Sequence, residues 1–154
     1  MLLFLLSKVG PMLQHAIISI DLNLNHHELY ERIWQPQAFL HWASGMCGAG
    51  LKQDGNAWTG EGMEGPLRVR FTEHNQFGIM DHFVSQAGEP EIYVPLRVVA
   101  NQEGSTVTIT LFRQRSTTET MFATEVEWAR RDLEALKLWV ERAGSRSSSI
   151  PSGS

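Results

Sequence analysis

The chain has 154 residues, the length of one ordinary domain. Hydrophobic residues make up 42% and charged residues 19%, a composition that excludes disorder of the whole chain. The net charge of −4 argues against a nucleic-acid-binding module, which would carry a basic face. A single cysteine, Cys47, excludes an internal disulfide and a cysteine-built zinc site, and it fits a reducing, cytoplasmic setting.

The two ends of the chain differ in composition from its middle. Residues 2–6 form an apolar run that is too short for a signal peptide or for a membrane span, which needs about 20 apolar residues. We interpret this run as an extension or as an extra strand or interface arm. The Ser/Gly/Pro-rich C-terminal stretch has too little apolar content to order itself. The sequence thus predicts an extension at 1–13, one domain at 14–143 and a disordered tail at 144–154.

The first part of the domain predicts a strand followed by two short helices. Residues 16–20 are short and β-branched, which is typical of a strand. Asn25 and Glu28 have the spacing of a capping box, so a helix is expected to begin there and to end before Pro36. Because proline is well tolerated in the first turn of a helix, Pro36 predicts a second helix over 37–43.

Alternation of apolar and polar residues predicts a series of strands in the middle of the chain. Turn-rich connectors of hairpin length separate the strands, so an antiparallel sheet is expected. Counting through the connectors places Leu96 opposite Ile109 and His82 opposite Val94. The expected strands span 46–53, 57–61, 67–72, 78–85, 92–100 and 105–113.

The same counting extends the register to the strand at 67–72 and defines two faces of the sheet. It places Val69 opposite His82 on the inner face, and it predicts an ion pair between Arg70 and Asp81 on the outer face. The inner face is then apolar and the outer face polar or charged.

The last part of the domain predicts one long helix over 118–142. Apolar residues recur there at spacings of three and four, which gives the helix one continuous apolar stripe. Gly144 follows as a stop signal. The stripe consists of Phe122, Val126, Ala129, Leu133, Leu136 and Val140.

His82 is the polar exception on the apolar inner face. One interpretation is a core histidine whose ring is hydrogen-bonded to the backbone or to a helix side chain. The other is a polar group on a cavity wall that orients a ligand or acts as an acid or base. Glu125 lies one step from the helix stripe and is either a solvated residue or a carboxylate at the cavity mouth, within reach of His82.

Aromatic side chains gather where the mouth of a pocket is expected, and rigid aromatic walls suit an apolar ligand. No phosphate-binding glycine loop, nucleophile elbow or metal-ligand spacing occurs, so neither a cofactor nor a metal is predicted. The candidate ligand-binding residues are Trp34, Phe39, Trp42, Trp58, Val69, Phe71, Met80, Val94, Leu96, Ile109, Leu111, Phe122 and Trp128.

Several segments carry a resemblance to a known superfamily. Residues 29–42, with the sequence LYERIWQPQAFLHW, resemble a segment of the START-like (SRPBCC, Bet v 1-like) superfamily. Residues 81–84, 93–99, 110–113 and 122–137 resemble a largely uncharacterised subgroup whose members are often labelled polyketide cyclase-like. The resemblance implies an α+β helix-grip fold, in which a curved antiparallel sheet wraps around a long C-terminal helix and two short helices follow the first strand.

The resemblance also implies a deep cavity between the sheet and the C-terminal helix. We therefore expect the protein to bind a small hydrophobic molecule there, aromatic or polyketide-like. An enzyme of the polyketide cyclase/aromatase type, with His82 as acid or base, is one alternative. A protein-interaction module of the co-chaperone type is another, and it predicts an exposed apolar patch. A homodimer through the outer sheet face or the arm at 2–6 is a further open possibility.

Overall fold

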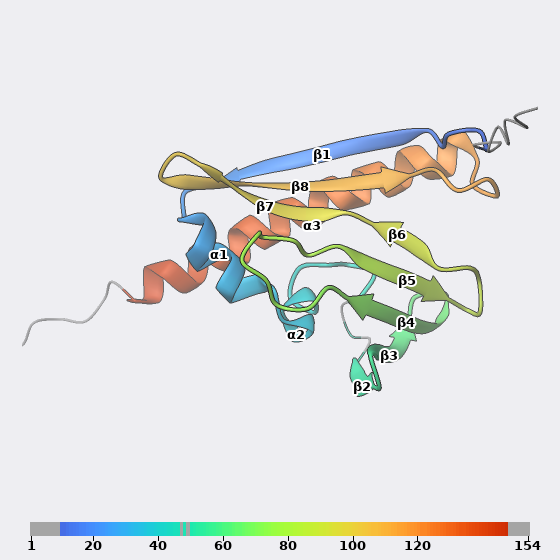
Figure 1. The fold of residues 1–154 in the computed structure, drawn as a ribbon, viewed down its shortest axis with the longest axis horizontal. Helices are drawn as coiled ribbons and strands as arrows, with labels where there is room; N and C mark the ends of the chain where they lie inside the picture. The colour runs from blue at the N-terminus through green and yellow to red at the C-terminus, as the bar shows by residue number, and fades with distance from the viewer. Residues whose placement is uncertain (1–9, 47, 49, 148–154) are drawn as a thin grey trace, which may run out of the picture.

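The computed structural model describes residues 10–46, 48 and 50–147. Cys47, the apolar arm at 2–6 and the end of the predicted tail lie outside the described residues. The elements follow one another in the order that the sequence predicts (Figure 1). They are β1 (His15–Leu22), α1 (His26–Ile33), α2 (Pro36–Phe39), β2 (Lys52–Asp54), β3 (Ala57–Gly62), β4 (Gly65–Phe71), β5 (His82–Gln86), β6 (Ile92–Val94), β7 (Leu96–Asn101), β8 (Gly104–Phe112) and α3 (Glu119–Ser147).

The described strands form two antiparallel sheets, with the orders β1-β8-β7 and β2-β3-β4-β5-β6. Helix α3 packs on β1 and β8 of the first sheet, and α1 packs on β7 and β8 of the same sheet (Figure 1). Phe39 of α2 contacts Phe71 and His82 of the second sheet. The two sheets meet at Pro95, which splits the single strand expected at 92–100 into β6 and β7. Proline has no N–H to donate to a ladder, so the chain bends here and each half keeps a different neighbour. This arrangement confirms the predicted helix-grip fold.

Two of the predicted registers are confirmed. Leu96 pairs with Ile109 between β7 and β8, and His82 pairs with Val94 between β5 and β6. Both registers were counted through short connectors, and the number of residues that each connector uses matches the count.

The predicted register between β4 and β5 was wrong by two residues. His82 pairs with Phe71 instead of Val69, and Val69 pairs with Val84. Because side chains alternate with a period of two, a shift of two residues keeps every side chain on its expected face. His82 and Phe71 therefore remain on the inner face.

The register shift arises in the connector between β4 and β5, which is longer than expected. The Asn75 Oδ1 atom accepts hydrogen bonds from the N–H groups of Phe77 and Ile79, at 2.9 and 3.1 Å. Gly78 then adopts a φ of 68°, and its carbonyl accepts from the N–H of Val98 on β7 at 2.9 Å. The Asp81 carbonyl oxygen still accepts from the N–H of Thr72 at 3.1 Å, but the residues before it, up to Met80, run along β7.

The predicted ion pair between Arg70 and Asp81 was also wrong. Arg70 donates from Nε and Nη2 to Glu91 at 2.8 and 2.6 Å, and its guanidinium lies 4.5 Å from the centre of the Phe83 ring. Asp81 is paired with Arg97 on β7. The connector explains the difference, because it directs the Asp81 carboxylate to Leu96 and Arg97 of β7.

Helix α3 covers the first sheet with its predicted apolar stripe. The helix begins after Thr118, whose Oγ1 accepts from the N–H of Met121 at 3.1 Å, and it continues to Ser147, beyond the expected end at Arg142. Residues 144–147 of the predicted tail thus belong to the helix. None of the helices in the described part of the chain has the length and apolar composition of a bilayer span.

Candidate functional site

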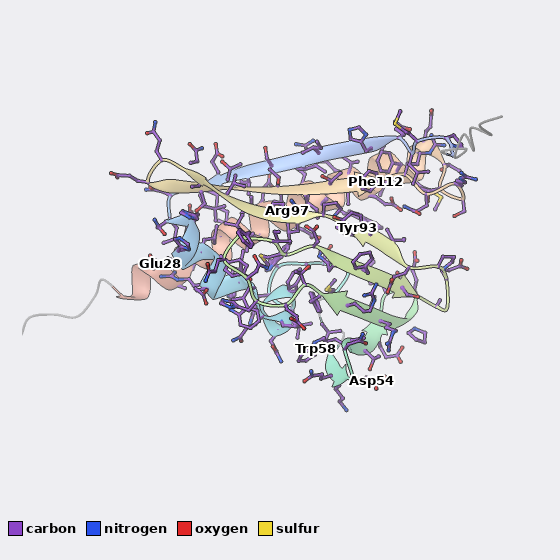
Figure 2. The ribbon with its side chains drawn as sticks, viewed as in Figure 1. Glu28, Asp54, Trp58, Tyr93, Arg97 and Phe112 are labelled. Atoms are coloured by element: carbon purple, nitrogen blue, oxygen red, sulfur yellow. The ribbon has the colours of Figure 1, made fainter. Side chains whose placement is uncertain are left out.

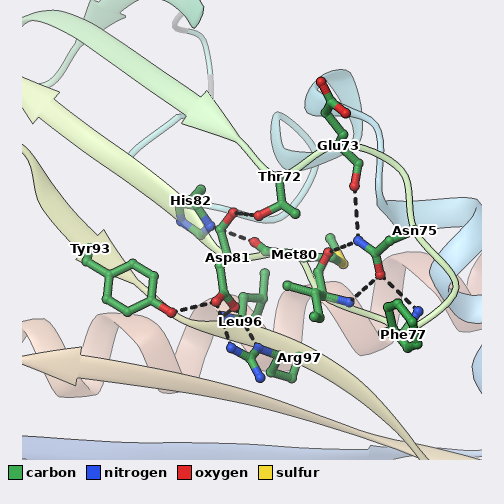
Figure 3. A network of polar contacts seen from close by, with 11 residues as sticks. Thr72, Glu73, Asn75, Phe77, Met80, Asp81, His82, Tyr93, Leu96 and Arg97 are labelled. Carbon is green, nitrogen blue, oxygen red and sulfur yellow. Dashed lines mark hydrogen bonds and ion pairs between the residues drawn. The ribbon is translucent and has the colours of Figure 1, made fainter. Parts of the chain in front are cut away.

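His82 lies on the inner face of the second sheet, and only 5% of its surface is exposed. Its Nδ1 atom is 3.1 Å from the carbonyl oxygen of Met80 (Figure 3). Because a carbonyl oxygen can only accept, Nδ1 carries the proton and Nε2 is the basic ring atom. The ring meets Phe39 edge-on with centroids 5.3 Å apart, and it lies 5.9 Å from Phe71.

Burial lowers the pKa of His82, and the hydrogen bond to Met80 and the negative charge of Asp81 only partly offset that effect. The imidazole is therefore neutral at pH 7. A neutral ring with a fixed Nδ1–H can offer Nε2 as a hydrogen-bond acceptor or as a base.

The candidate ligand-binding residues differ in how far they are exposed. Trp128 on α3 is 45% exposed, whereas Trp42 is buried and its Nε1–H has no hydrogen-bond partner among the described residues. The buried ones are Phe39, Trp42, Val69, Met80, Leu96, Ile109 and Phe122. The partly buried ones are Trp34, Trp58, Phe71, Val94 and Leu111.

Three of the partly buried residues line one groove, which we call the aromatic groove. Trp34, Trp58 and Phe71 enclose a volume of about 700 Å³ between the α1–α2 junction and strands β2 to β4. Figure 2 shows Trp58 at the β3 side of this region. The Phe71 ring also contacts Phe39 at 4.8 Å, and both of these rings contact His82. His82 therefore lies directly behind the aromatic groove.

The polar lining of the aromatic groove is mostly uncharged or already paired. His74 Nε2 lies 2.7 Å from Glu31 Oε1, and the His74 ring packs 4.7 Å from Trp34. Arg70 is held by Glu91. The neutral hydrogen-bonding side chains of the lining are those of Gln35, Gln37, Gln53, Asn56 and Thr72.

Glu125 and Trp128 line a different groove, which we call the helix groove. It has a volume of about 440 Å³ and lies between α3 and the β3–β4 turn, which contributes Met63 and Glu64. Burial raises the pKa of Glu125, and the negative charge of Glu64 adds to that effect. Among the described residues no hydrogen bond joins Glu125 to His82, so the structure does not bring the two candidate catalytic residues together.

Sequence reasoning missed a polar cluster around the buried Asp81, next to His82. Asp81 accepts hydrogen bonds from the Tyr93 hydroxyl at 2.6 Å, the Leu96 N–H at 3.1 Å and Arg97 Nε and Nη2, both at 2.7 Å (Figure 3). Burial raises the pKa of Asp81, but these hydrogen bonds and the charge of Arg97 outweigh burial and leave that pKa below its usual value. The ionised Asp81 thus joins the two sheets where Pro95 separates them. Two residues carried the available signal: an acid, Asp81, next to the inward-facing His82, and the strand-breaking Pro95.

Comparison with known proteins supports the fold. No protein-family model and no curated protein matches the sequence. DynU16, a protein of the dynemicin biosynthetic locus, matches 82% of this chain at 14% identity and a TM-score of 0.62, and the match covers 47% of DynU16. The Aha1 dimer from Colwellia psychrerythraea matches 80% of this chain and 93% of its own, at 13% identity and a TM-score of 0.61. Ara h 8.0201 matches 84% of this chain and 99% of its own, at 7% identity and a TM-score of 0.57.

This chain spans about half the length of the DynU16 structure. At such low identities the similarity establishes the fold. The chain has a helix-grip fold like that of these structures, as its sequence predicts.

Proposed function

We propose that the protein binds a small hydrophobic molecule, aromatic or polyketide-like, in the aromatic groove. The observation that carries the proposal is the convergence of Trp34, Trp58 and Phe71 on one opening of about 700 Å³. Small-molecule sites usually have volumes of about 300–1,000 Å³ and mainly apolar walls with a few polar groups. Each 100 Å² of apolar ligand surface removed from water contributes about 2.5 kcal/mol to binding.

His82 gives the site an orienting group behind its aromatic wall. A ligand that moves the Phe71 ring aside meets a neutral imidazole whose Nδ1 is held by Met80. Nε2 then accepts a hydrogen bond from a hydroxyl group of the ligand. The neighbour DynU16 belongs to a biosynthetic locus, which supports a small-molecule ligand for this fold.

Fluorescence titration tests the proposed site. The probe is anilinonaphthalene sulfonate, followed by competition with a panel of uncharged aromatic and polyketide-like compounds. We expect Trp58→Ala to weaken binding about tenfold, which corresponds to about 1.4 kcal/mol, because the ligand loses one aromatic wall. The matched control is Trp128→Ala in the helix groove, which should leave the affinity unchanged. Equal affinities of wild type and Trp58→Ala, or weaker binding only in Trp128→Ala, would refute the site.

The neutral imidazole of His82 also favours an enzymatic alternative of the cyclase/aromatase type, in which Nε2 removes a proton from the bound molecule. Compounds that bind are incubated with the protein, and the products are analysed by mass spectrometry. Turnover that His82→Gln abolishes while binding persists would support the enzyme. Binding without turnover would support a carrier.

A further inference from the structure

Strand β1 has an open edge. It is the outermost strand of its sheet, at the top of Figure 1, and no other described strand pairs with its outer side. The Gln14 carbonyl accepts from the N–H of Arg113 at 2.8 Å, so the even-numbered residues of β1 direct their backbone groups to β8. The odd-numbered residues from 15 to 21 therefore direct their N–H and C=O groups outward.

The open edge lacks most of the features that prevent an edge strand from pairing with a strand of another chain. Natural edge strands usually carry lysine, proline or a bulge. The strand HAIISIDL contains neither lysine nor proline, and it pairs with β8 without interruption from His15 to Leu22. Lys137 Nζ donates to the Asp21 carbonyl oxygen at 3.0 Å, and that oxygen keeps a second lone pair. Ile17, on the outer face of this edge, is 65% exposed.

We propose that β1 pairs antiparallel with β1 of a second copy of this chain across a twofold axis. Opposed residues of an antiparallel pair lie on the same face, so odd-numbered residues must meet odd-numbered residues. A register centred on Ile18 places His15 opposite Asp21 of the partner subunit and Ile17 opposite Ser19 of the partner subunit. Each of these pairs exchanges two backbone hydrogen bonds.

Hydrogen-bond complementarity selects this register. Centred on Ile18, both exposed ends of the strand place a histidine beside a carboxylate. Asp21 Oδ1 accepts from the Thr106 hydroxyl at 2.6 Å, and its second oxygen can accept from a ring N–H of the partner's His15. A register centred on Ile17 places His15 opposite Ser19 of the partner subunit, and one centred on Ser19 places Asp21 opposite Ile17 of the partner subunit. Both lose the histidine–carboxylate pairs. In the register centred on Ile18, the three-stranded sheets of the two copies join into one larger sheet, and their inner faces lie on the same side of it.

The proposed interface is independent of the proposed ligand site. The aromatic groove lies on strands β2 to β4 of the other sheet, at the bottom of Figure 1, and β1 lies at the top. Pairing through β1 therefore leaves the groove open. A failure of either proposal has no bearing on the other.

Sedimentation analysis of the full chain tests the dimer. Ser19→Pro removes an outward N–H that makes no bond to β8, and Ile17→Lys places a charge beside the open edge. We expect a dimeric wild type and at least a tenfold weaker dimer in each variant, with circular dichroism showing that both variants fold. The matched control is Val99→Lys, which changes a 45% exposed β-branched residue on β7 and should leave the dimer intact.

An exchange of these two residues tests the register. His15→Asp opposes two carboxylates across the axis and should weaken the dimer, and adding Asp21→His should restore it. A monomeric wild type overturns the proposal. This includes a monomer in which the Ile17 and Ser19 amides are protected from hydrogen exchange, since another part of the same chain then covers the edge of β1. A dimer that both edge variants leave intact also overturns it, and a double exchange that fails to restore the dimer overturns the register.

Discussion

Removal of the Asp81 carboxylate is the most informative test of how the two sheets are joined. The substitution Asp81→Ala deletes the acceptor for Tyr93, Arg97 and the Leu96 N–H at once. Leu96 is fully buried, so its N–H is left without a partner and without access to water. Asp81→Asn keeps one oxygen that can accept from Leu96, but it loses the charge.

The expected magnitude follows from burial. An unsatisfied buried N–H costs about 1–3 kcal/mol, and removing one partner of a buried ion pair costs about 3–5 kcal/mol. The Arg97 side chain is 45% exposed, so water solvates it after the change and the second figure is discounted. We expect Asp81→Ala to lower the free energy of unfolding by about 3 kcal/mol, and Asp81→Asn by about 1–2 kcal/mol. At this chain length, 3 kcal/mol corresponds to a fall in Tm of about 6–12 °C.

Urea unfolding at pH 7 measures these differences, with Glu91→Gln as the control. Glu91 belongs to a more exposed ion pair with Arg70, and we expect its substitution to change stability little. Since the pKa of Asp81 is lowered in the fold, its contribution is present above the unfolded value of about 3.9 and is lost as the pH falls through the lower folded value. Equal losses in Asp81→Ala and Glu91→Gln would refute the reasoning.

Three further predictions concern the same region. The pKa of His82 is lower in the folded protein than in the unfolded chain, so below about pH 6.5 the unfolded chain binds more protons. Urea midpoints should therefore fall as the pH is lowered from about 6.5, and the fall should be smaller in His82→Gln. Gly78→Ala should cost about 3 kcal/mol, because a Cβ would lie 2.1 Å from the Val98 carbonyl oxygen at a φ of 68°. Gly88→Ala, with a φ of 77° and open space around it, should cost about 1–2 kcal/mol by the same assay, and equal losses would contradict the clash. Asn75→Ala should cost about 2 kcal/mol, and unchanged urea midpoints would show that its side chain does not organise the connector.

Alternation along β4, β7 and β8 was enough to predict which face of these strands is buried. The β7–β8 register followed from a connector of minimal length, and Leu96 opposite Ile109 was therefore predicted correctly. The β4–β5 register could not be predicted in this way. There the length of the connector depends on the hydrogen bonds of the Asn75 amide and on the positive φ of Gly78. The alternation of apolar and polar residues does not reveal either feature.

The sequence was enough to predict which side chains of the candidate site point to the inner face, but not which elements pack over them. The inward direction of Phe71 and His82 followed from their parity on the strand. Which element covers each stretch of the inner face depends on tertiary packing, so the predicted single wall divides into a packed core, the aromatic groove and the helix groove. Glu125 and His82 lie in different places for this reason.

The pairing of β1 with β8 has a consequence for biosynthesis. Ile18 pairs with Ile109, which leaves the ribosome 91 residues later, and α3 follows after that. The first strand must therefore wait for nearly the whole chain before it gains a neighbour, which makes folding slow. During that wait its β-branched sequence is exposed to other nascent chains, so a chaperone that shields residues 15–22 should raise the yield more than one that acts on the finished protein.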